Sequence, residues 1–389
     1  MASAGAEPSV ALAHHWLVNM RGGERVLAAM AAMFPDAPIY TLMARPAALD
    51  ADLRARDIRV SWLQRLAWLP GGQRLALPVL VSAARSLDAS GHEVVICSDA
   101  AAIKAIRTRP EALKLCYCHS PMRYVWDLYD EYRGGSGLAG RAGLRLFAGR
   151  LRRGDQEAAE TVTAFIANSR YVAGRIRRCY GREASVIHPP VNTDFPPPLD
   201  TPEDFYLVVG EQVRYKRNDL AVRACNRLRR RLVIIGGGPL LGPIRRAAGP
   251  TVTVLGRQSD ATVRDHLRRC RALLFCGRED FGIVPVEAQA AGRPVIAFAE
   301  GGVLETVIDG RTGVFFHEQT VESLAAAIER FEAATTLLSP ARIQAHAARF
   351  SAGRFREEFT AFYHWCLELY RAGGPHRVRS ALQTDTSGE

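Results

Sequence analysis

The amino-acid sequence predicts an α/β protein with two tandem domains, each built around a parallel sheet. Its 389 residues are enough for two domains of ordinary size, and a hydrophobic share of 48% allows a large core. Short apolar, β-branched runs alternate with longer helical segments along the chain, which is typical of parallel α/β sheets. This alternation stops once, at a proline-rich stretch, and then starts again.

That stretch, DFPPPLDTPE, contains three consecutive prolines, which exclude both a helix and a central strand. We therefore expect an interdomain linker at 196–203, between an amino-terminal domain at 1–195 and a carboxy-terminal domain at 204–353. An amphipathic helix at 354–372 is expected to pack back on the amino-terminal domain. The polar tail at 373–389 is expected to be disordered.

The amino-terminal domain opens with a strand, a glycine loop and a helix, as nucleotide-binding α/β folds do. Gly22 and Gly23 in this loop allow another group to approach the backbone closely, although a plain tight turn explains the pair equally well. The G-x-G-x-x-G spacing of a dinucleotide site is absent. The apolar runs predict strands at 10–13, 92–98, 113–119, 164–169 and 185–191, and the Ala-rich run predicts a helix at 26–34.

Three polar residues follow the predicted strand 113–119, in the sequence CHSPMRYVWD: His119, Arg123 and Asp127. Residues just past the carboxyl end of a parallel strand face the ligand crevice of an open sheet. A lone histidine is more often structural, but one that precedes a proline at a strand end, near a second cation, favours a functional role. These three residues are therefore candidates for chemistry.

Four loops of the carboxy-terminal domain carry candidate ligand-binding residues. Lys216 and Arg214 follow the strand 205–210, and cations there can neutralise a diphosphate. Gly237 and Gly238 follow the strand 232–235 and let a ligand touch the main chain, with tight-turn packing as the alternative. Because parallel strands end at one edge of a sheet, these loops should converge with the loops that follow the strands 272–276 and 294–298. The sequence also predicts a strand at 252–255 and a helix at 219–230.

The loop after 272–276 holds two carboxylates. Glu279 lies in a polar loop, and Glu287 falls at the start of a predicted helix, just after Pro285, which suits a first helical turn. A helix N-terminus favours anions, so carboxylates beside it need a reason. One reason is capping. The other is a ligand that offers phosphates to the N–H groups and hydroxyls to the carboxylates, as a nucleotide-sugar does.

The net charge of +11 and a pI near 9.5 indicate an anionic partner, which could be nucleic acid, anionic lipid or a phosphorylated substrate. No aromatic-interleaved pattern of single-strand binding accompanies the charge, so nucleic acid is not the expected partner. Tryptophans and arginines mix at 58–87, as at a membrane interface, with a buried helical pair as the equal alternative. The basic stretch 141–153, inside an Arg- and Gly-rich region, suits anion or membrane contact, or a solvated helix face.

The eight cysteines are scattered, lie mostly in apolar runs and include no C-x-x-C pair, which indicates reduced core thiols and a cytoplasmic location. Neither a signal peptide nor an apolar run long enough to span a bilayer is evident. Peripheral contact with the inner face of the plasma membrane is compatible with both features.

Asp50 and Asp52 form the nearest match to a metal-binding D-x-D motif. They lie in a polar helical stretch, so we expect a surface position and no required metal or cofactor. The G-x-S-x-G, H-E-x-x-H and P-loop patterns are missing.

Several motifs together resemble the retaining glycosyltransferases of family 4. They are the E-x7-E pair Glu279 and Glu287, followed by A-x-A-x-G-x-P-V-I-A and E-G-G-x-x-E, with supporting matches at Gly22-Gly23-Glu24, Asn168-Ser169, HPPVNTDF, Val209-Gly210…Lys216 and Gly237-Gly238-Pro239. The resemblance covers nearly the whole chain and implies the GT-B fold, in which two Rossmann-like domains face each other across a cleft. CHSPMRYVWD resembles more particularly the bacterial O-antigen and exopolysaccharide mannosyltransferases.

The resemblance also implies roles. Glu279 holds hydroxyls of the donor sugar, Glu287 takes the ribose hydroxyls, and Lys216 binds the diphosphate and helps the nucleotide leave. His119 lies beside the sugar and joins Glu279 and Lys216 as a catalytic candidate, while Arg123 and Asp127 are candidates on the acceptor side. The remaining donor-binding positions are Gly22, Gly23, Arg214, Gly237, Gly238, Phe281, Gly282 and Ile283.

The implied activity is transfer of a hexose, specifically mannose from GDP-mannose, to a lipid-linked saccharide in surface polysaccharide synthesis. One position departs from the family: Glu211 stands where Arg usually follows the glycine aligned with Gly210. A carboxylate cannot bind phosphate, and Arg214 is the candidate replacement. Three alternatives remain open: another nucleotide-sugar donor, an epimerase or phosphorylase on the same architecture, and a non-catalytic nucleotide- or polyanion-binding protein.

Overall fold

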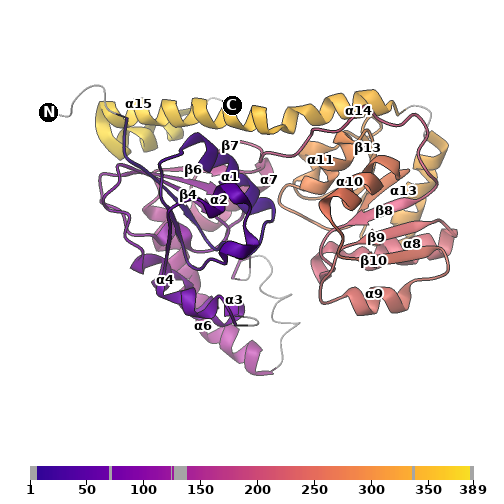
Figure 1. Cartoon of the computed structure of the whole chain (residues 1–389), viewed down its shortest axis with the longest axis horizontal. Coiled ribbons are helices and arrows are strands. Elements are labelled where there is room, and N and C mark those ends of the chain that lie inside the picture. The colour runs from indigo at the N-terminus through magenta and orange to yellow at the C-terminus, as the bar shows by residue number, and fades with distance from the viewer. Residues whose placement is uncertain (1–6, 70–71, 124, 127–137, 335–337, 386–389) are drawn as a thin grey trace. The chain divides into compact units, whose positions relative to one another are not determined.

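A computed structural model describes residues 7–69, 72–123, 125–126, 138–334 and 338–385 (Figure 1). The chain divides into two compact units. Unit 1 comprises Met1–His188 and Arg356–Glu389, and unit 2 comprises Pro189–Phe355. Each unit contains one parallel sheet with helices on its faces, so the predicted α/β class with two domains is confirmed.

Unit 1 has a seven-stranded sheet in the order β3-β2-β1-β4-β5-β6-β7, with every recorded pairing parallel. Strand order reverses at the β1/β4 pair, where His14 lies opposite Ser98. In an open α/β sheet such a reversal places a crevice at the carboxyl ends of the strands. The strands are β1 Val10–His14, β2 Ile39–Thr41, β3 Ile58–Val60, β4 Val94–Asp99, β5 Leu113–Cys118, β6 Ala164–Ala167 and β7 Ala184–Val186.

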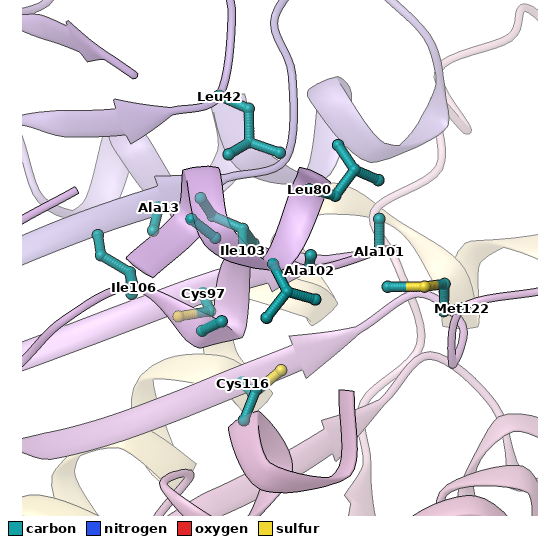
Figure 2. Close-up of a cluster of buried hydrophobic side chains, with 14 of the residues drawn as sticks. Ala13, Leu42, Leu80, Cys97, Ala101, Ala102, Ile103, Ile106, Cys116 and Met122 are labelled. Atoms are coloured by element: carbon teal, nitrogen blue, oxygen red, sulfur yellow. The ribbon is translucent and has the colours of Figure 1, made fainter. Parts of the chain in front are cut away.

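The core of unit 1 lies between this sheet and the helices that follow β3 and β5. Alternate residues of β4 and β5, including Cys97 and Cys116, meet Ile103, Leu80 and Met122 (Figure 2). The helices are α1 Gly22–Met33, α2 Ala51–Arg54, α3 Gly72–Leu75, α4 Leu80–Ser86, α6 Leu138–Glu160 and α7 Arg170–Tyr180, with 3-10 turns η1 Pro46–Ala48, η2 Trp62–Leu66, η3 Leu77–Val79 and η4 Ile103–Ala105.

The chain returns to unit 1 at its carboxyl end through α15 (Ala352–Asp385). Tyr363 of this helix contacts Phe34, and the Thr360 hydroxyl lies 3.6 Å from the sulfur of Met33. The disordered tail expected from residue 373 was wrong for residues 375–385, which stay helical. The chain breaks helical geometry only at Gly373 and Gly374, because Gly374 adopts a φ of 67° that glycine tolerates, and the helix then continues.

Unit 2 has a six-stranded parallel sheet in the order β10-β9-β8-β11-β12-β13, which reverses at the β8/β11 pair. Its strand residues alternate between two cores: Leu274 faces the side covered by α8 and α13, and Leu273 faces the side covered by α10 and α11. This explains the continuous apolar runs of the sequence. The strands are β8 Tyr206–Val209, β9 Leu232–Ile235, β10 Val252–Gly256, β11 Ala272–Phe275, β12 Val295–Phe298 and β13 Gly313–Phe316.

The helices of unit 2 are α8 Asn218–Leu228, α9 Leu241–Ala247, α10 Asp260–Arg269, α11 Ile283–Ala290, α12 Val303–Thr306, α13 Val321–Ala334 and α14 Pro340–Ala347, with 3-10 turns η5 Arg214–Lys216 and η7 Ala348–Phe350. The boundary between the units lies at His188–Pro189, before the proline-rich linker predicted at 196–203. The reason is local packing. Val191 is buried against Phe281 and Phe350 and pairs with Ser351, so the chain already belongs to unit 2 there.

All eight cysteines are buried free thiols, as predicted. Asp50 is an exposed N-cap of α2 and accepts a hydrogen bond from the N–H of Leu53, so the D-x-D stretch is a surface helix start. Within the described ranges, none of the helices is long and apolar enough to cross a membrane.

Candidate active site

The carboxyl edge of the unit 2 sheet brings together two residues that the sequence singled out separately. Lys216 ends η5, after β8, and Glu279 follows β11, so the two residues flank the reversal of strand order. The Lys216 Nζ lies 2.8 Å from the Glu279 Oε1, and their side chains are 16% and 20% exposed. The pair is therefore largely withdrawn from water while still open to a ligand.

Glycines permit this close approach of loops. At Gly210, a Cβ would stand 3.0 Å from the Lys216 Nζ, and at Gly236 it would stand 1.8 Å from the carbonyl oxygen of Gly210. Both residues also have φ above 130°, a region that residues with a Cβ rarely adopt. The Lys216 ammonium thus occupies the space that any side chain at position 210 would fill.

The Glu279 loop is held from the other side by the turn after β12. Gly302 donates its N–H to the carbonyl of Glu279 at 2.9 Å, and a Cβ on Gly302 would stand 2.3 Å from the carbonyl oxygen of Asp280. Glu279 and Gly301 also form a parallel bridge. Side chains at 301 or 302 would push the loop away, so E-G-G after β12 is a packing requirement of the Glu279 loop.

Gln212 is a positioning residue that the sequence reading missed. Its side chain is 1% exposed, donates to the carbonyl of Gly210 at 2.8 Å and accepts from Asn218 at 2.9 Å. The Gly238 turn packs directly on its backbone, and a Cβ on Gly238 would stand 2.7 Å from the carbonyl oxygen of Gln212. A Cβ on Gly237, in contrast, would meet no described atom within 4 Å. Gly237 therefore leaves open space where Gly238 is needed for packing.

Helix α11 begins at Ile283, with Gly282 as its N-cap at a φ of 90° and Phe281 buried beneath it. Gly282 has no side chain with which to cap this N-terminus. Glu287 was expected at the helix start, but it is the fifth residue of α11, beyond the first turn. Because the helix begins before Pro285, capping by Glu287 is ruled out, and its carboxylate lies half-buried on the helix surface.

Arg214 and Glu211 lie in the loop before Lys216. Arg214 is exposed and Glu211 half-buried. The turn continues into Arg217, which has a φ of 49°, an uncommon conformation for a residue with a side chain. This tight turn orients Lys216 toward Glu279.

The carboxyl edge of the unit 1 sheet carries a different cluster, formed by two histidines and a serine. The Ser98 hydroxyl lies 3.0 Å from Nδ1 of His14 and 2.8 Å from Nε2 of His119. His14 is the last residue of β1 and Ser98 is the penultimate residue of β4; both are fully buried, and His119 follows β5. The backbone of His119 is fixed at both ends, since its N–H donates to Asp99 and its carbonyl accepts from Asn168.

This geometry favours one arrangement of protons. Ser98 has a single proton and two lone pairs, so at most one imidazole can accept from it and at least one must donate to it. Among the described atoms, Nε2 of buried His14 has no hydrogen-bond partner. A buried N–H without an acceptor is rarer than an unsatisfied acceptor, so the His14 proton belongs on Nδ1. Ser98 then donates to Nε2 of His119.

Both histidines at the end of β1 are uncharged at neutral pH. Burial lowers the pKa of His14 well below its usual value, and the neighbouring His15 and His119 lower it further. Burial also lowers the pKa of His15 to about 4, against a smaller opposing effect of Asp99. The edge of unit 1 is therefore neutral, whereas that of unit 2 carries paired charges.

Gly22 and Gly23 begin α1 beside this cluster. A Cβ on Gly23 would stand 3.4 Å from Cε1 of His14 and 3.7 Å from Nε2 of His119. The Glu24 carboxylate accepts the N–H of Arg21 and fixes the first turn. The start of α1 thus lies beside the imidazoles, and a Cβ at position 23 would make only ordinary van der Waals contact with them.

A buried ionic network supports the histidine edge from within unit 1. Lys104 Nζ contacts Asp99 Oδ2 at 2.9 Å and Asp155 Oδ1 more closely still, and all three side chains are inaccessible. Asp155 also accepts hydrogen bonds from Trp126 and Tyr180, both at 2.8 Å. Burial alone would lower the pKa of Lys104, but Asp155 and Asp99 outweigh it and raise that pKa well above its usual value.

Of the acceptor-side candidates, Arg123 is half-buried and its Nε lies 3.4 Å from the Ser120 hydroxyl, which also accepts from buried Arg175 at 2.9 Å. Asp127 lies outside the described residues. The structure thus groups the predicted residues by unit: Lys216, Glu279, Gly237, Gly238 and the start of α11 share one edge, and His119, Gly22 and Gly23 share the other. His14 and Ser98 were missed, although Ser98 ends the predicted strand 92–98 and His14 directly follows the predicted strand 10–13, and a strand end was the signal that selected His119.

Comparison with known proteins agrees with this architecture. Residues 192–348, most of unit 2, match the profile of the family "Glycosyl transferases group 1". A GDP-mannose-dependent alpha-(1-6)-phosphatidylinositol monomannoside mannosyltransferase from Mycolicibacterium smegmatis is 30% identical over 235 residues, covering 52% of this chain and 57% of that protein. The match thus spans less than two thirds of the relative.

Solved structures match over almost the full chain. Sucrose-phosphate synthase from Thermosynechococcus elongatus has a TM-score of 0.70 at 19% identity, covering 93% of this chain and 100% of that one. Anabaena HepE, in complex with UDP and glucose, has a TM-score of 0.66 at 16% identity, covering 92% and 100%. The chain therefore has the two-domain GT-B fold of glycosyltransferases, with residues 192–348 matching glycosyl transferases of group 1.

Proposed function

We propose that this protein is a retaining glycosyltransferase that transfers mannose from GDP-mannose to a lipid-linked saccharide in surface polysaccharide synthesis. The observation that carries the proposal is the Lys216–Glu279 pair at the strand-order reversal of unit 2, with Nζ and Oε1 2.8 Å apart. A cation and a carboxylate at this place suit the two halves of a nucleotide-sugar, its diphosphate and its sugar hydroxyls.

The proposed chemistry follows from the charges that develop during transfer. Breaking the bond between the anomeric carbon and the diphosphate leaves negative charge on the phosphate and positive charge on the sugar. Lys216 and the N–H groups at the start of α11 stabilise the departing diphosphate because they are fixed before the reaction begins. Glu279 accepts hydrogen bonds from sugar hydroxyls. In the unliganded protein each charge of the pair neutralises the other, and a bound donor offers each a new partner.

The choice of donor and acceptor rests on two resemblances. The matched relative from Mycolicibacterium smegmatis is named for GDP-mannose as donor and phosphatidylinositol monomannoside, a glycolipid, as acceptor. The sequence around His119 resembles bacterial mannosyltransferases that build surface polysaccharides. We place the reaction in the cytoplasm, because eight buried free thiols suit a reducing compartment.

The donor is tested by measuring nucleotide release. Purified protein is given GDP-mannose, GDP-fucose, UDP-glucose or UDP-galactose, each with a polyprenyl-diphosphate saccharide acceptor. GDP release with GDP-mannose alone is the expected result, and release of UDP alone would refute the proposed donor. Glu279→Ala should abolish turnover, whereas Glu322→Ala, which removes an exposed carboxylate paired with Arg227, should preserve it. Full activity of Glu279→Ala would refute the site.

Two observations favour alternatives, one to the donor and one to the catalytic function itself. The similar Anabaena structure holds UDP and glucose, so a UDP-sugar donor is the second candidate. Glu211 in place of the usual Arg, together with the net charge of +11, favours a non-catalytic protein that binds nucleotides or polyanions. Calorimetry separates this reading, because tight binding of arbitrary nucleic acid without binding of any nucleotide-sugar would support it.

A further inference from the structure

We propose that exposed side chains of 58–69 and 72–79 in unit 1 form a docking surface for an anionic lipid bilayer. The surface, called the Trp face below, consists of Val60, Trp62, Trp68, Leu69, Leu75 and Val79 with the cations Arg59 and Arg65. The proposal concerns binding to lipid and is independent of the proposed transfer reaction.

Exposed apolar side chains are concentrated on this segment. Of the nine large hydrophobic residues that are exposed in the described ranges, six lie between residues 60 and 79. Trp68 and Leu75 are each 64% exposed, and Trp62 is 52% exposed. Single exposed apolar residues are ordinary, but a group of them, including two tryptophans, on one short segment indicates an interaction site.

Buried neighbours fix the segment so that the Trp face points outward. Leu63, Ala67, Ala76 and Leu80 belong to the core of unit 1, and each lies next to an exposed member of the face. Figure 2 shows Leu80 within that core. The predicted alternatives for 58–87 were a buried helical pair and a membrane interface. The segment is not a buried helical pair, because its short helical turns are buried on one side and exposed on the other.

Hydrogen bonds hold these turns to the end of β2. The Gln64 side chain accepts from the N–H of Ala44 at 2.8 Å and donates to its carbonyl at 2.9 Å. The Ser61 hydroxyl donates to the carbonyl of Leu42 at 2.7 Å. The Arg45 guanidinium lies 5.9 Å from the ring centroid of Trp68. These contacts fix the turns that carry the tryptophans before any lipid is bound. Little conformational entropy is therefore lost when the tryptophan side chains insert into a bilayer.

The charge of the segment matches anionic headgroups. Residues 58–87 contain four arginines and neither aspartate nor glutamate, but Arg59 pairs with Asp57 and Arg85 pairs with Glu157. Arg65 is exposed, and no described carboxylate pairs with it. Helix α6 packs against α4 at Gly154, where a Cβ would stand 3.1 Å from Val81, and it carries the exposed cations Arg150 and Arg153. Figure 1 shows α3, α4 and α6 together in unit 1.

These features favour a bilayer over a protein partner. Tryptophan rings and arginines together suit the zone between headgroups and acyl chains, where a ring is half in hydrocarbon and a guanidinium meets phosphate. The exposed cation Arg65 beside an apolar centre suits a lipid surface that is anionic throughout. The short helical turns allow shallow insertion of side chains without burying backbone.

Vesicle sedimentation tests the proposal directly. The full chain is mixed with vesicles of phosphatidylcholine alone or of phosphatidylcholine with phosphatidylglycerol, at low and high salt. Binding to the anionic vesicles, weakened by salt, is expected. Trp62→Ser and Trp68→Ser should each reduce the partition coefficient about tenfold. Arg65→Gln should reduce binding to anionic vesicles about fivefold, as expected for one interfacial cation, and leave binding to neutral vesicles unchanged.

Matched controls come from exposed residues of unit 2. Leu199→Ser and Arg257→Gln alter an exposed apolar and an exposed cationic side chain outside the Trp face, and both should bind vesicles as the unaltered protein does. Melting temperature confirms that each variant is folded. Failure of the unaltered protein to bind anionic vesicles at low salt would overturn the proposal. So would a Trp62→Ser, Trp68→Ser double variant that binds normally, or a Trp face that mediates self-association without binding vesicles.

Discussion

The two sheet edges of this protein share one topology and differ in their electrostatics. In each sheet the strand order reverses once, at β1/β4 in unit 1 and at β8/β11 in unit 2, and polar residues gather at the strand ends beside the reversal. In unit 1 these residues are His14, Ser98 and His119. Burial lowers the pKa of His14 and of the neighbouring His15, so both imidazoles are neutral. In unit 2 they are the oppositely charged Lys216 and Glu279.

The difference shows how one architecture can serve two kinds of chemistry. A neutral, hydrogen-bonded edge can position a substrate or exchange a proton, because imidazole and hydroxyl groups both donate and accept. A paired, partly open charged edge can exchange its internal partner for a charged ligand. The first depends on dryness and packing, and the second on residual access to solvent. Each of the predictions below changes one of these conditions.

The largest effect is expected where a buried charge supports the neutral edge. Lys104→Met leaves Asp99 and Asp155 without their cation, and loss of one partner from a buried ionic group costs about 3–5 kcal/mol of unfolding free energy. Chemical denaturation measures this cost. Arg85→Met, which breaks an exposed pair with Glu157, should cost at most about 1 kcal/mol. Equal stability of the two variants would contradict the supporting role of the network.

On the charged edge, Lys216→Met should impair the proposed transfer strongly while leaving the fold intact. Removing one preorganised group that stabilises developing charge typically lowers kcat about 10²–10³-fold. Steady-state nucleotide release gives the value. Arg227→Met serves as the control, because Arg227 pairs with Glu322 at an exposed site. Turnover that is similar in both variants would show that Lys216 does not act on the leaving group.

The neutral edge should make stability sensitive to acid. Because the pKa of His15 falls to about 4 in the folded state, the unfolded chain binds a proton below about pH 6.5 and the folded chain does not. Stability is therefore lost as pH falls from about 6.5 to about 4, by about 3 kcal/mol at most for this residue. Unfolding free energies of His15→Gln should depend less on pH in this window. His317→Gln, at an exposed site, should follow the unaltered protein, and an unchanged slope for His15→Gln would refute the prediction.

Ser98→Ala tests whether the serine sets the protonation of His119. The variant loses the hydrogen bonds to both imidazoles and should cost about 1–2 kcal/mol of stability. The sharper measurement is the nitrogen chemical shifts of His119, which should report a changed tautomer population. Ser90→Ala, on an exposed turn, should leave those shifts as they are. Identical His119 spectra in both variants would remove the assigned role.

The smallest effect is expected at the departure from the family pattern. If Arg214 replaces the cation missing at position 211, Arg214→Gln should weaken donor binding about fivefold. This factor corresponds to a binding free energy of roughly 1 kcal/mol, as expected for one exposed charge contact. Calorimetry with GDP-mannose measures this change. Adding Glu211→Arg to that variant should restore the affinity. An unchanged affinity in Arg214→Gln would assign phosphate binding to Lys216 and the main chain alone.

The sequence by itself determined the fold class, most strands and one edge of each sheet. Apolar runs report burial on both faces, and the glycines after β8, β9 and β12 mark places where backbones meet, so the convergence of the Lys216 and Glu279 loops could be predicted. Strands β2 and β13 were missed, although strands of the same length, such as β7 and β9, were predicted.

Only the tertiary structure decided which residues meet. The Ser98 contact with His14 and His119 joins three strands, and the Lys104 network joins η4, β4 and α6. No local pattern encodes such distances. The same holds for the Trp face: the composition of 58–87 suited burial and exposure equally, and the packing of Leu63, Ala67 and Leu80 decided which side chains face outward. Residue types determine what can be buried, and the three-dimensional packing of distant segments determines what is.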